Sequence, residues 1–237
     1  MIEPFSQTFT RTHTTAVARR APAMGRCVMS LTMMLAVLMQ ASCGEALVAS
    51  GLIPKPKVFA EFKLTPGPIV VLVDDFQDLC YWPGAADLLA DKVAEQLKDH
   101  NAAKIIIPQS RVRHVKQAHS EFDEMSCAAI GRLVEAEQLI LLEVQSFDAS
   151  ESPVEATASA RMGVSVKVIN VLEDKDPGSV RLWPRSRQGH PIEVELTAEK
   201  VIRAANQQEI LKELTGALAA QVARCFYDRR MDDFEKE

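Results

Sequence analysis

The sequence lacks the short motifs that mark the common catalytic and nucleotide-binding sites. Its 237 residues contain no Walker loop, no GxGxxG, no GxSxG and no HExxH. The five cysteines form no CxxC pair, so neither a zinc ribbon nor a thioredoxin-like redox site is supported. We therefore expect no catalytic residue and no cofactor, and the sequence does not name a reaction.

An excess of basic charge is also missing. The first 42 residues hold four of the 27 basic residues and one of the 32 acidic residues, which leaves the rest of the chain with a net charge of about −8. Binding to nucleic acid or to anionic lipid needs clustered lysine and arginine. The acidic balance therefore argues against nucleic acid as the main partner and against a polybasic membrane patch.

No apolar run is long enough to cross a bilayer as a helix, which takes ~20 residues. The run Cys27–Met39 has thirteen residues and follows Arg26. A basic segment, a short apolar segment and then small residues are typical of a secretory signal peptide, which we predict over residues 1–42. The alternatives are a twin-arginine signal through Arg19 and Arg20, and an organellar transit peptide.

The segment QASC, which ends at Cys43, resembles a bacterial lipobox, in which an apolar residue and two small residues precede a cysteine that receives a lipid. Ala41, Ser42 and Cys43 match, whereas Gln40 stands where an apolar residue is usual. We predict lipidation of Cys43; the alternative is a plain signal peptide cleaved nearby, with Cys43 incidental. No retention aspartate follows the cysteine, which favours the outer membrane of a bacterial envelope, with the domain facing the periplasm.

Prolines interrupt the chain between this cysteine and the first clear strand. Because proline breaks both helices and strand ladders, we predict that residues 43–68 are a lipidated cysteine and a flexible tether. The segment KVFAEF within the tether could form a short edge strand. The charged residues 231–237 are expected to be a solvated tail. The prolines of the tether are Pro54, Pro56, Pro66 and Pro68.

The segment 69–230 has the pattern of an α/β domain. Three short apolar runs predict strands buried in a sheet, and segments with apolar residues at helical spacing separate them. The strands are expected at Ile69–Val73, Lys104–Pro108 and Gln138–Phe147, and the helices at Gly84–His100, Gln109–Ala118 and Asp123–Glu137.

The pattern changes to alternation after the third strand. Residues 158–168 alternate apolar and polar side chains, which predicts a long half-exposed strand. Val180–Trp183 and Ile192–Leu196 are expected to complete an antiparallel meander, and Gln207–Tyr227 has the apolar stripe of a long helix. The fold class we predict is α/β, with a single mixed sheet (βαβαβ and then the meander), helices packed on it and a long C-terminal helix.

Several of these segments together resemble a group of uncharacterised bacterial envelope lipoproteins. They are GPIVVLVDDF, AADLLADKVAEQL, AKIIIPQSRV, IGRLVEAEQLILLEVQSF, RLWP and ARCFYD, all within Pro68–Asp228. The plan is similar to that of the curli-secretion lipoproteins and of the N-terminal domain of the Tol–Pal periplasmic protein. Their helix–strand unit is matched by Gly131, Ala136, Leu139, Ile140, Glu143 and Val144. The resemblance implies an envelope protein that binds other proteins without a known reaction; no segment matches the pore-forming strands of the secretion channel.

Two adjacent carboxylates, Asp74 and Asp75, end the first predicted strand, where α/β sheets place ligands. Paired carboxylates can hold Mg²⁺, so a metal-dependent enzyme or a phosphoacceptor-like domain is the alternative function. A phosphoacceptor domain needs another aspartate at a strand end and a lysine beyond it. Asp148 follows the third strand, but the later strands supply no matching lysine turn. The other interpretation of the pair is a turn at the end of a strand.

Histidine and cysteine give no further metal-binding pattern. His114 and His119 are five residues apart, which does not place them on one helix face. His190 lies in a loop with glycine and proline and has no visible partner. Cys127 and Cys225 lie on apolar helix faces, which favours buried thiols, with one disulfide and one free thiol as the alternative for the remaining cysteines of the domain. These are Cys80, Cys127 and Cys225.

Two segments with a Trp-Pro pair, DLCYWPG and RLWPRSRQGHP, are the predicted interaction sites. Tryptophan and arginine are favoured at protein interfaces, which indicates Trp82, Trp183, Arg185 and Arg187. The alternative is that both tryptophans cap the ends of the sheet as part of the core.

These patterns together predict a membrane-anchored envelope lipoprotein that acts as a non-catalytic module for protein interaction, assembly or transport. Its partners would be the membrane, through the lipid on Cys43, and other envelope proteins. A third interpretation is a structural subunit of a homo-oligomer, in which the long alternating strand pairs across protomers.

Overall fold

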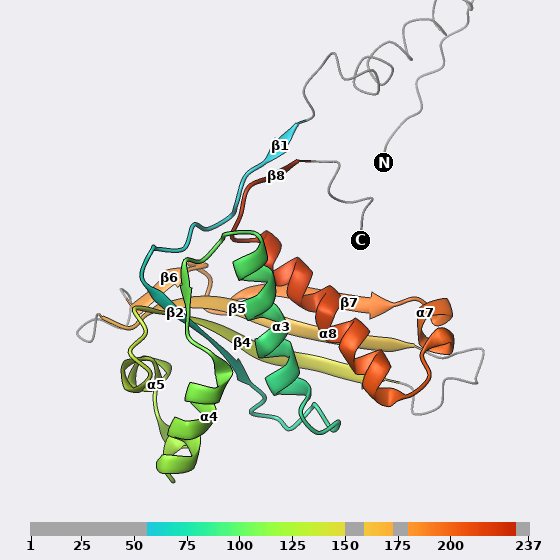
Figure 1. The fold of residues 1–237 in the computed structure, drawn as a ribbon, viewed down its shortest axis with the longest axis horizontal. Helices are drawn as coiled ribbons and strands as arrows, with labels where there is room; N and C mark the ends of the chain where they lie inside the picture. The colour runs from blue at the N-terminus through green and yellow to red at the C-terminus, as the bar shows by residue number, and fades with distance from the viewer. Residues whose placement is uncertain (1–55, 150–158, 173–179, 231–237) are drawn as a thin grey trace, which may run out of the picture. The chain divides into compact units, whose positions relative to one another are not determined.

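One mixed β-sheet carries the fold (Figure 1). The computed structural model describes residues 56–149, 159–172 and 180–230; the predicted signal peptide, Cys43 and the charged tail lie outside them. β3, β2, β4 and β5 lie side by side in that order, and β6 and β7 both pair with β5. The strands are β2 Pro68–Asp74, β3 Ile105–Ile106, β4 Gln138–Ala149, β5 Ala160–Asn170, β6 Arg181–Trp183 and β7 His190–Leu196.

The sheet is parallel on one side and antiparallel on the other. β2 pairs in parallel with β3 and β4, which requires crossover connections, and helices supply them. β5 is antiparallel to each of its neighbours, β4, β6 and β7. The predicted mixed sheet is confirmed. β6 and β7 lie end to end along β5, rather than side by side as in a meander.

Helices cover both faces of the sheet (Figure 1). Because side chains alternate along a strand, Ile69 and Val71 of β2 join the core under α3 and α8, whereas Val70 joins the core under α4 and α5. No helix within the described residues is long and apolar enough to cross a membrane. The helices are α3 Ala85–Asp99, α4 Gln109–Ala118, the 3-10 helix η1 Phe122–Glu124, α5 Cys127–Leu133, α7 Ala198–Arg203 and α8 Gln207–Arg224.

The helix predicted over Asp123–Glu137 is shorter than expected. The Ser126 hydroxyl accepts the Ala129 N–H at 3.2 Å and starts α5 there. Glu135, with φ of 63°, takes the left-handed conformation that typically follows a helix end. Ile105 in the short β3 is 54% exposed, so this predicted buried strand is an exposed edge strand.

β5 is largely buried on both faces, although its alternation predicts a half-exposed strand. Lys167 is only 8% exposed. Gly189, with φ of 83°, brings the loop before β7 against this face: a Cβ atom there would lie 2.0 Å from Ser165 Oγ. β5 pairs with β4 on one edge and with β6 and β7 on the other, so the prediction that it pairs across protomers is wrong.

Part of the predicted tether belongs to the folded domain, which begins at Pro56. β1 (Lys57–Val58) pairs antiparallel with β8 (Arg229–Arg230). The Ala60 N–H donates to the Asp228 carboxylate at 2.9 Å, and this hydrogen bond is the main reason that the pKa of Asp228 lies well below its usual range. These contacts hold the N-terminal arm, residues 56–64, on the domain.

Candidate functional site

β7 presents the longest strand edge that has no partner strand among the described residues. It runs over seven residues and pairs with β5 on one side only. Every second residue of such a strand turns its N–H and C=O groups away from its neighbour. Pro191, near its start, is a residue that sheets tolerate mainly at an edge. The outer edge of β7 is therefore a surface on which another strand can pair.

The two faces of this edge differ in character. Ile192 and Val194 are half-buried against the core on the α8 side, whereas Glu193 and Glu195 are exposed on the other face. Arg161 Nε lies 3.4 Å from Glu193 Oε1, and Glu195 makes no ion pair with a described residue. The edge is therefore apolar on one side and acidic on the other.

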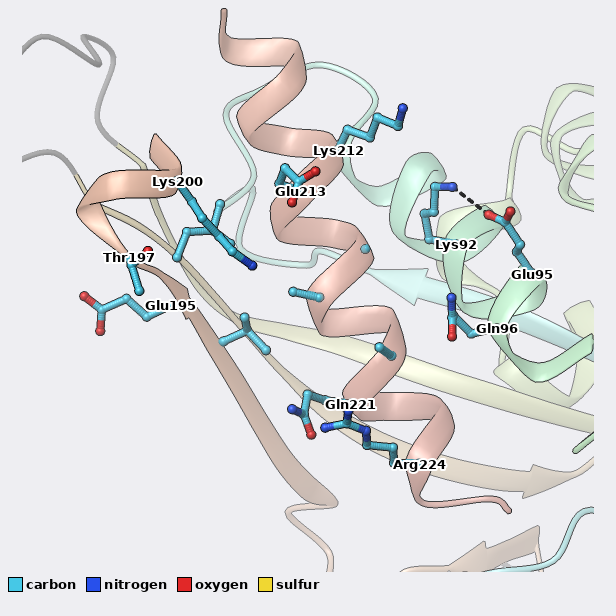
Figure 2. Close-up of a pocket in the computed structure, with 15 residues that line it drawn as sticks. Lys92, Glu95, Gln96, Glu195, Thr197, Lys200, Lys212, Glu213, Gln221 and Arg224 are labelled. Atoms are coloured by element: carbon cyan, nitrogen blue, oxygen red, sulfur yellow. Dashed lines mark hydrogen bonds and ion pairs between the residues drawn. The ribbon is translucent and has the colours of Figure 1, made fainter. Parts of the chain in front are cut away.

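A groove of about 630 Å³ crosses the outer surface of α8 and reaches β7 (Figure 2). Lys92 and Glu95 of α3, which form an ion pair at 2.6 Å, lie on one side of it. Thr197 and Lys200 lie on the other side, at the end of β7 and in α7. Small residues of α8 form its floor: Gly216, Ala217 and Ala220. The groove, called the α8 groove below, has room for side chains of a polypeptide segment.

The position of α8 follows from its sequence. Asn206 accepts the Glu209 N–H at 2.9 Å, and the Glu209 carboxylate accepts the Ala205 N–H at 2.7 Å, which together cap the first turn. Fully buried side chains at helical spacing fix the inner face, so the small residues of the groove face outward. The inner residues are Ile210, Leu214, Leu218 and Val222.

Asp75 has a structural role in the loop after β2. Its two carboxylate oxygens accept the N–H groups of Leu79 and Cys80, each at 2.8 Å. These bonds close a turn at the end of the strand. This agrees with the interpretation of the acidic pair as a turn at the end of a strand.

Asp74 lies at the rim of a pocket of about 430 Å³ with Lys116 and Asp123. Burial raises the pKa of the Asp74 carboxyl, and the nearby charge of Glu143 raises it further. Glu143 lies opposite Asp74 in the β2–β4 register, and its carboxylate pairs with the ammonium group of Lys167. The pocket is acidic: four aspartates and one lysine, Lys116, line it, and Lys116 pairs with Asp123 at 3.0 Å.

Two charged residues near Asp74, Glu143 and Lys167, are not predicted from the sequence, and one predicted residue, Asp148, lies elsewhere. Asp148 lies on the far part of β4 and pairs with Arg161 at 3.7 Å rather than with Asp74. Glu143 and Lys167 take the positions beside Asp74. The available signal was a charged residue within each of two apolar strands, Glu143 in β4 and Lys167 in β5, and only the pairing of those strands brings the two charges together.

The predicted interaction residues fall into separate places. Trp82 is 7% exposed and packs edge-on against Phe147, with ring centroids 5.6 Å apart. Trp183 is half-buried, with its ring centroid 5.0 Å from that of His190. Both tryptophans therefore pack within the fold, in two separate aromatic groups. Arg185 and Arg187 are exposed in the loop between β6 and β7.

The cysteines of the described part of the chain are free thiols. Burial raises the pKa of Cys80 and of Cys225 to about 12, and it also raises the pKa of Cys127. Thiols with such pKa values are poor nucleophiles at neutral pH. One of them has neighbours with metal-binding atoms: Glu61, His190 and Cys225 each bring a ligand atom within 4.8 Å of the other two.

No protein-family model matches the chain, and no curated protein matches it. The solved structures that this chain resembles in fold include the following three. The PelC dodecamer from Paraburkholderia phytofirmans is 14% identical with a TM-score of 0.41, over 74% of this chain and 97% of that one. Lipoprotein GNA1162 from Neisseria meningitidis is 12% identical with a TM-score of 0.41, over 67% of this chain and 99% of that one. The hypothetical protein CT253 from Chlamydia trachomatis is 11% identical with a TM-score of 0.38, over 67% and 96%.

A bacterial lipoprotein is thus among the solved structures that this chain resembles.

Proposed function

We propose that the chain is a lipid-anchored protein of a bacterial cell envelope whose α/β domain binds a partner protein, without catalysis, by adding a strand to the outer edge of β7. The observation that carries the proposal is the free edge of β7, seven residues long. Strand addition of this kind obtains affinity from main-chain hydrogen bonds and specificity from alternate side chains. The α8 groove beside the edge gives room for those side chains.

The predicted signal peptide and the lipobox-like segment support the anchor. Cys43 precedes the start of the folded domain at Pro56 by 13 residues. A fully extended chain spans at most ~3.6 Å per residue, so the domain would stay within about 50 Å of the lipid. The partner would therefore lie at the same membrane or close to it.

A second copy of the chain fits the edge of β7 poorly. If two copies of β7 pair antiparallel over the whole strand with the same face up, Glu193 of one copy lies opposite Glu193 of the other. A shift by two residues places Glu193 opposite Glu195. Like charges directly opposite each other destabilise a strand pair. The edge therefore favours a different strand, with lysine or arginine at alternate positions.

Peptide binding tests this proposal directly. A fluorescent seven-residue peptide that alternates valine and lysine should bind the full chain, and the same peptide with glutamate in place of lysine should bind at least tenfold more weakly. The double variant Glu193→Lys/Glu195→Lys should reverse this preference, because both exposed charges of the edge change sign. Fluorescence anisotropy measures both affinities.

Two controls separate strand addition from plain charge attraction. The double variant Asp91→Lys/Glu124→Lys changes two exposed acids on α3 and η1 by the same charge and should leave binding unchanged. A lysine peptide with N-methyl groups on alternate residues keeps its charge but cannot pair along a strand. Equal binding of the methylated and unmethylated peptides would contradict the proposal.

A further inference from the structure

Three side chains with metal-binding atoms meet where the N-terminal arm, β7 and α8 come together. They are Glu61 of the arm, His190 at the start of β7 and Cys225 at the end of α8. Each brings a ligand atom within 4.8 Å of the other two, and His190 Nδ1 lies 3.5 Å from Glu61 Oε2. His190 therefore pairs with Glu61, which lies more than a hundred residues earlier in the chain. The sequence alone does not indicate this partner.

Backbone contacts hold these three positions together. The N–H groups of Glu61 and Phe62 both donate to the Cys225 carbonyl, at 2.9 and 3.1 Å. His190 pairs with Val166 in the β5–β7 ladder. Cys225 is 5% exposed and caps the C-terminus of α8, where the helix dipole favours a positive charge. The group is thus preformed by hydrogen bonds that do not depend on an ion.

We propose that Glu61, His190 and Cys225 bind a divalent transition-metal ion, with zinc as the preferred ion. A thiolate, an imidazole and a carboxylate are ligands that zinc accepts, whereas magnesium and calcium prefer oxygen atoms alone. Zinc–ligand bonds of ~2.0–2.3 Å place tetrahedral ligand atoms ~3.3–3.8 Å apart. The ligand atoms, which lie within 4.8 Å of one another, therefore need to approach by about 1.5 Å at most. Glu61 is exposed, which leaves a fourth position open to water.

The charges of the group suit such an ion. The Glu61 carboxylate and a Cys225 thiolate together balance the two positive charges of zinc. Burial keeps the pKa of Cys225 high without an ion, with Glu61 adding to the shift and Arg229 opposing it. The thiol then lies 3.9 Å from the Gln221 carbonyl. Binding of the ion releases the thiol proton to solvent.

An ion at this site would tie the N-terminal arm to the end of α8 and to the start of β7. The arm leads toward Cys43, so the ion would strengthen the connection between the domain and its anchor. This consequence is independent of whether β7 pairs with a partner strand.

Cobalt binding by the full chain tests the site. Cobalt replaces zinc in sulfur-containing sites and gives a thiolate-to-cobalt charge-transfer band in the ultraviolet. Titration of the chelator-treated, reduced chain should show this band with one equivalent of cobalt, and zinc but not magnesium should abolish it. Cys225→Ser should lose the band, whereas Cys127→Ser, which removes a thiol elsewhere, should keep it.

Glu61→Gln keeps the test valid if Cys225→Ser does not fold, because Glu61 is exposed and its replacement leaves the core intact. This variant should bind zinc at least tenfold more weakly in competition with a chelating dye. Zinc should also slow hydrogen exchange at the Glu61 and Phe62 amides of the wild type. A cobalt band that survives in Cys225→Ser, absence of the band in the wild type, or unchanged zinc affinity in Glu61→Gln would each overturn the proposal.

Discussion

Removal of the Lys167 charge should destabilise the sheet strongly at neutral pH. Lys167 is 8% exposed, and its ammonium group pairs with Glu143, whose side chain is 29% exposed. Glu143 lies opposite Asp74 in the β2–β4 register. Lys167→Met keeps most of the volume of the aliphatic stem. It leaves two neighbouring carboxylates without their cation.

The structure sets the size of this effect. Loss of one partner of a fully buried ion pair costs ~3–5 kcal/mol, because the other charge stays buried. Glu143 keeps contact with water, so we expect Lys167→Met to lower the free energy of unfolding by ~2–3 kcal/mol. Glu143→Gln leaves the more deeply buried ammonium group alone and should cost at least as much. The double variant Lys167→Met/Glu143→Leu should lie within ~1 kcal/mol of the wild type, since apolar residues often replace a buried pair without loss.

The pH dependence of the Lys167→Met variant gives a second readout. In the wild type, burial and then Glu143 raise the pKa of Asp74, while Lys167 acts in the opposite direction. Without Lys167 the pKa of Asp74 in the folded state rises further above its value in the unfolded state. The folded state then binds this proton more readily, so the stability lost at neutral pH should return as the pH falls through the raised pKa.

Urea unfolding followed by circular dichroism measures these changes, at neutral and at mildly acidic pH. Arg203→Met is the matched control: it removes a cation from an exposed ion pair in α7 and should change stability by less than ~0.5 kcal/mol. A loss below ~0.5 kcal/mol for Lys167→Met would refute the reasoning. The reasoning would also be refuted if the free energy of unfolding lost by the double variant equalled the sum of the losses of the two single variants. The same holds if the loss for Lys167→Met grew as the pH falls.

Three further predictions concern the loop after β2, the anchor and the thiols. Asp75→Ala should lower the free energy of unfolding by ~1–2 kcal/mol in urea, because two backbone N–H groups lose their acceptor, and Asp75→Asn should cost less. Cys43→Ser should lose both a metabolic fatty-acid label and sedimentation with membranes, whereas Cys27→Ser should keep both; a label retained by Cys43→Ser would exclude the anchor. Cys80 and Cys225 should react with iodoacetamide at pH 8 far more slowly than free cysteine, since pKa values of about 12 leave little thiolate; fast labelling of the folded chain would contradict their burial.

Local patterns in the sequence predicted much of the fold. The apolar run of β2 and the helical spacing in α3 and α4 gave elements close to those observed. These signals are local. A run of apolar residues indicates a strand that is buried on both faces, and apolar residues at helical spacing indicate a helix that is buried along one stripe. The sequence pattern predicted the position of β5 correctly, but it predicted a half-exposed strand where the strand is largely buried. Its polar side chains are covered by a loop that approaches closely at Gly189, and such coverage has no local pattern.

The candidate sites depend on contacts between distant segments, which one sequence does not encode locally. Asp75 could be interpreted as a turn residue because its acceptor role is completed within five residues. Glu143 and Lys167 are 24 residues apart and meet only through the register of β4 and β5. The ligand atoms of Glu61 and Cys225 meet because the N-terminal arm folds back onto the end of α8. The prolines of that segment predict a flexible tether instead.

β7 connects the two proposals, and its alternation allows them to be tested separately. His190 shares the α8 side of the strand with Ile192 and Val194, whereas Glu193 and Glu195 point to the other side. Glu61→Gln should therefore weaken zinc binding and leave the lysine peptide bound as before. Glu193→Lys/Glu195→Lys should reverse peptide preference and leave the cobalt band unchanged. A Glu61→Gln variant that no longer bound the lysine peptide, or a Glu193→Lys/Glu195→Lys variant that lost the cobalt band, would contradict the assignment of the two functions to opposite faces of β7.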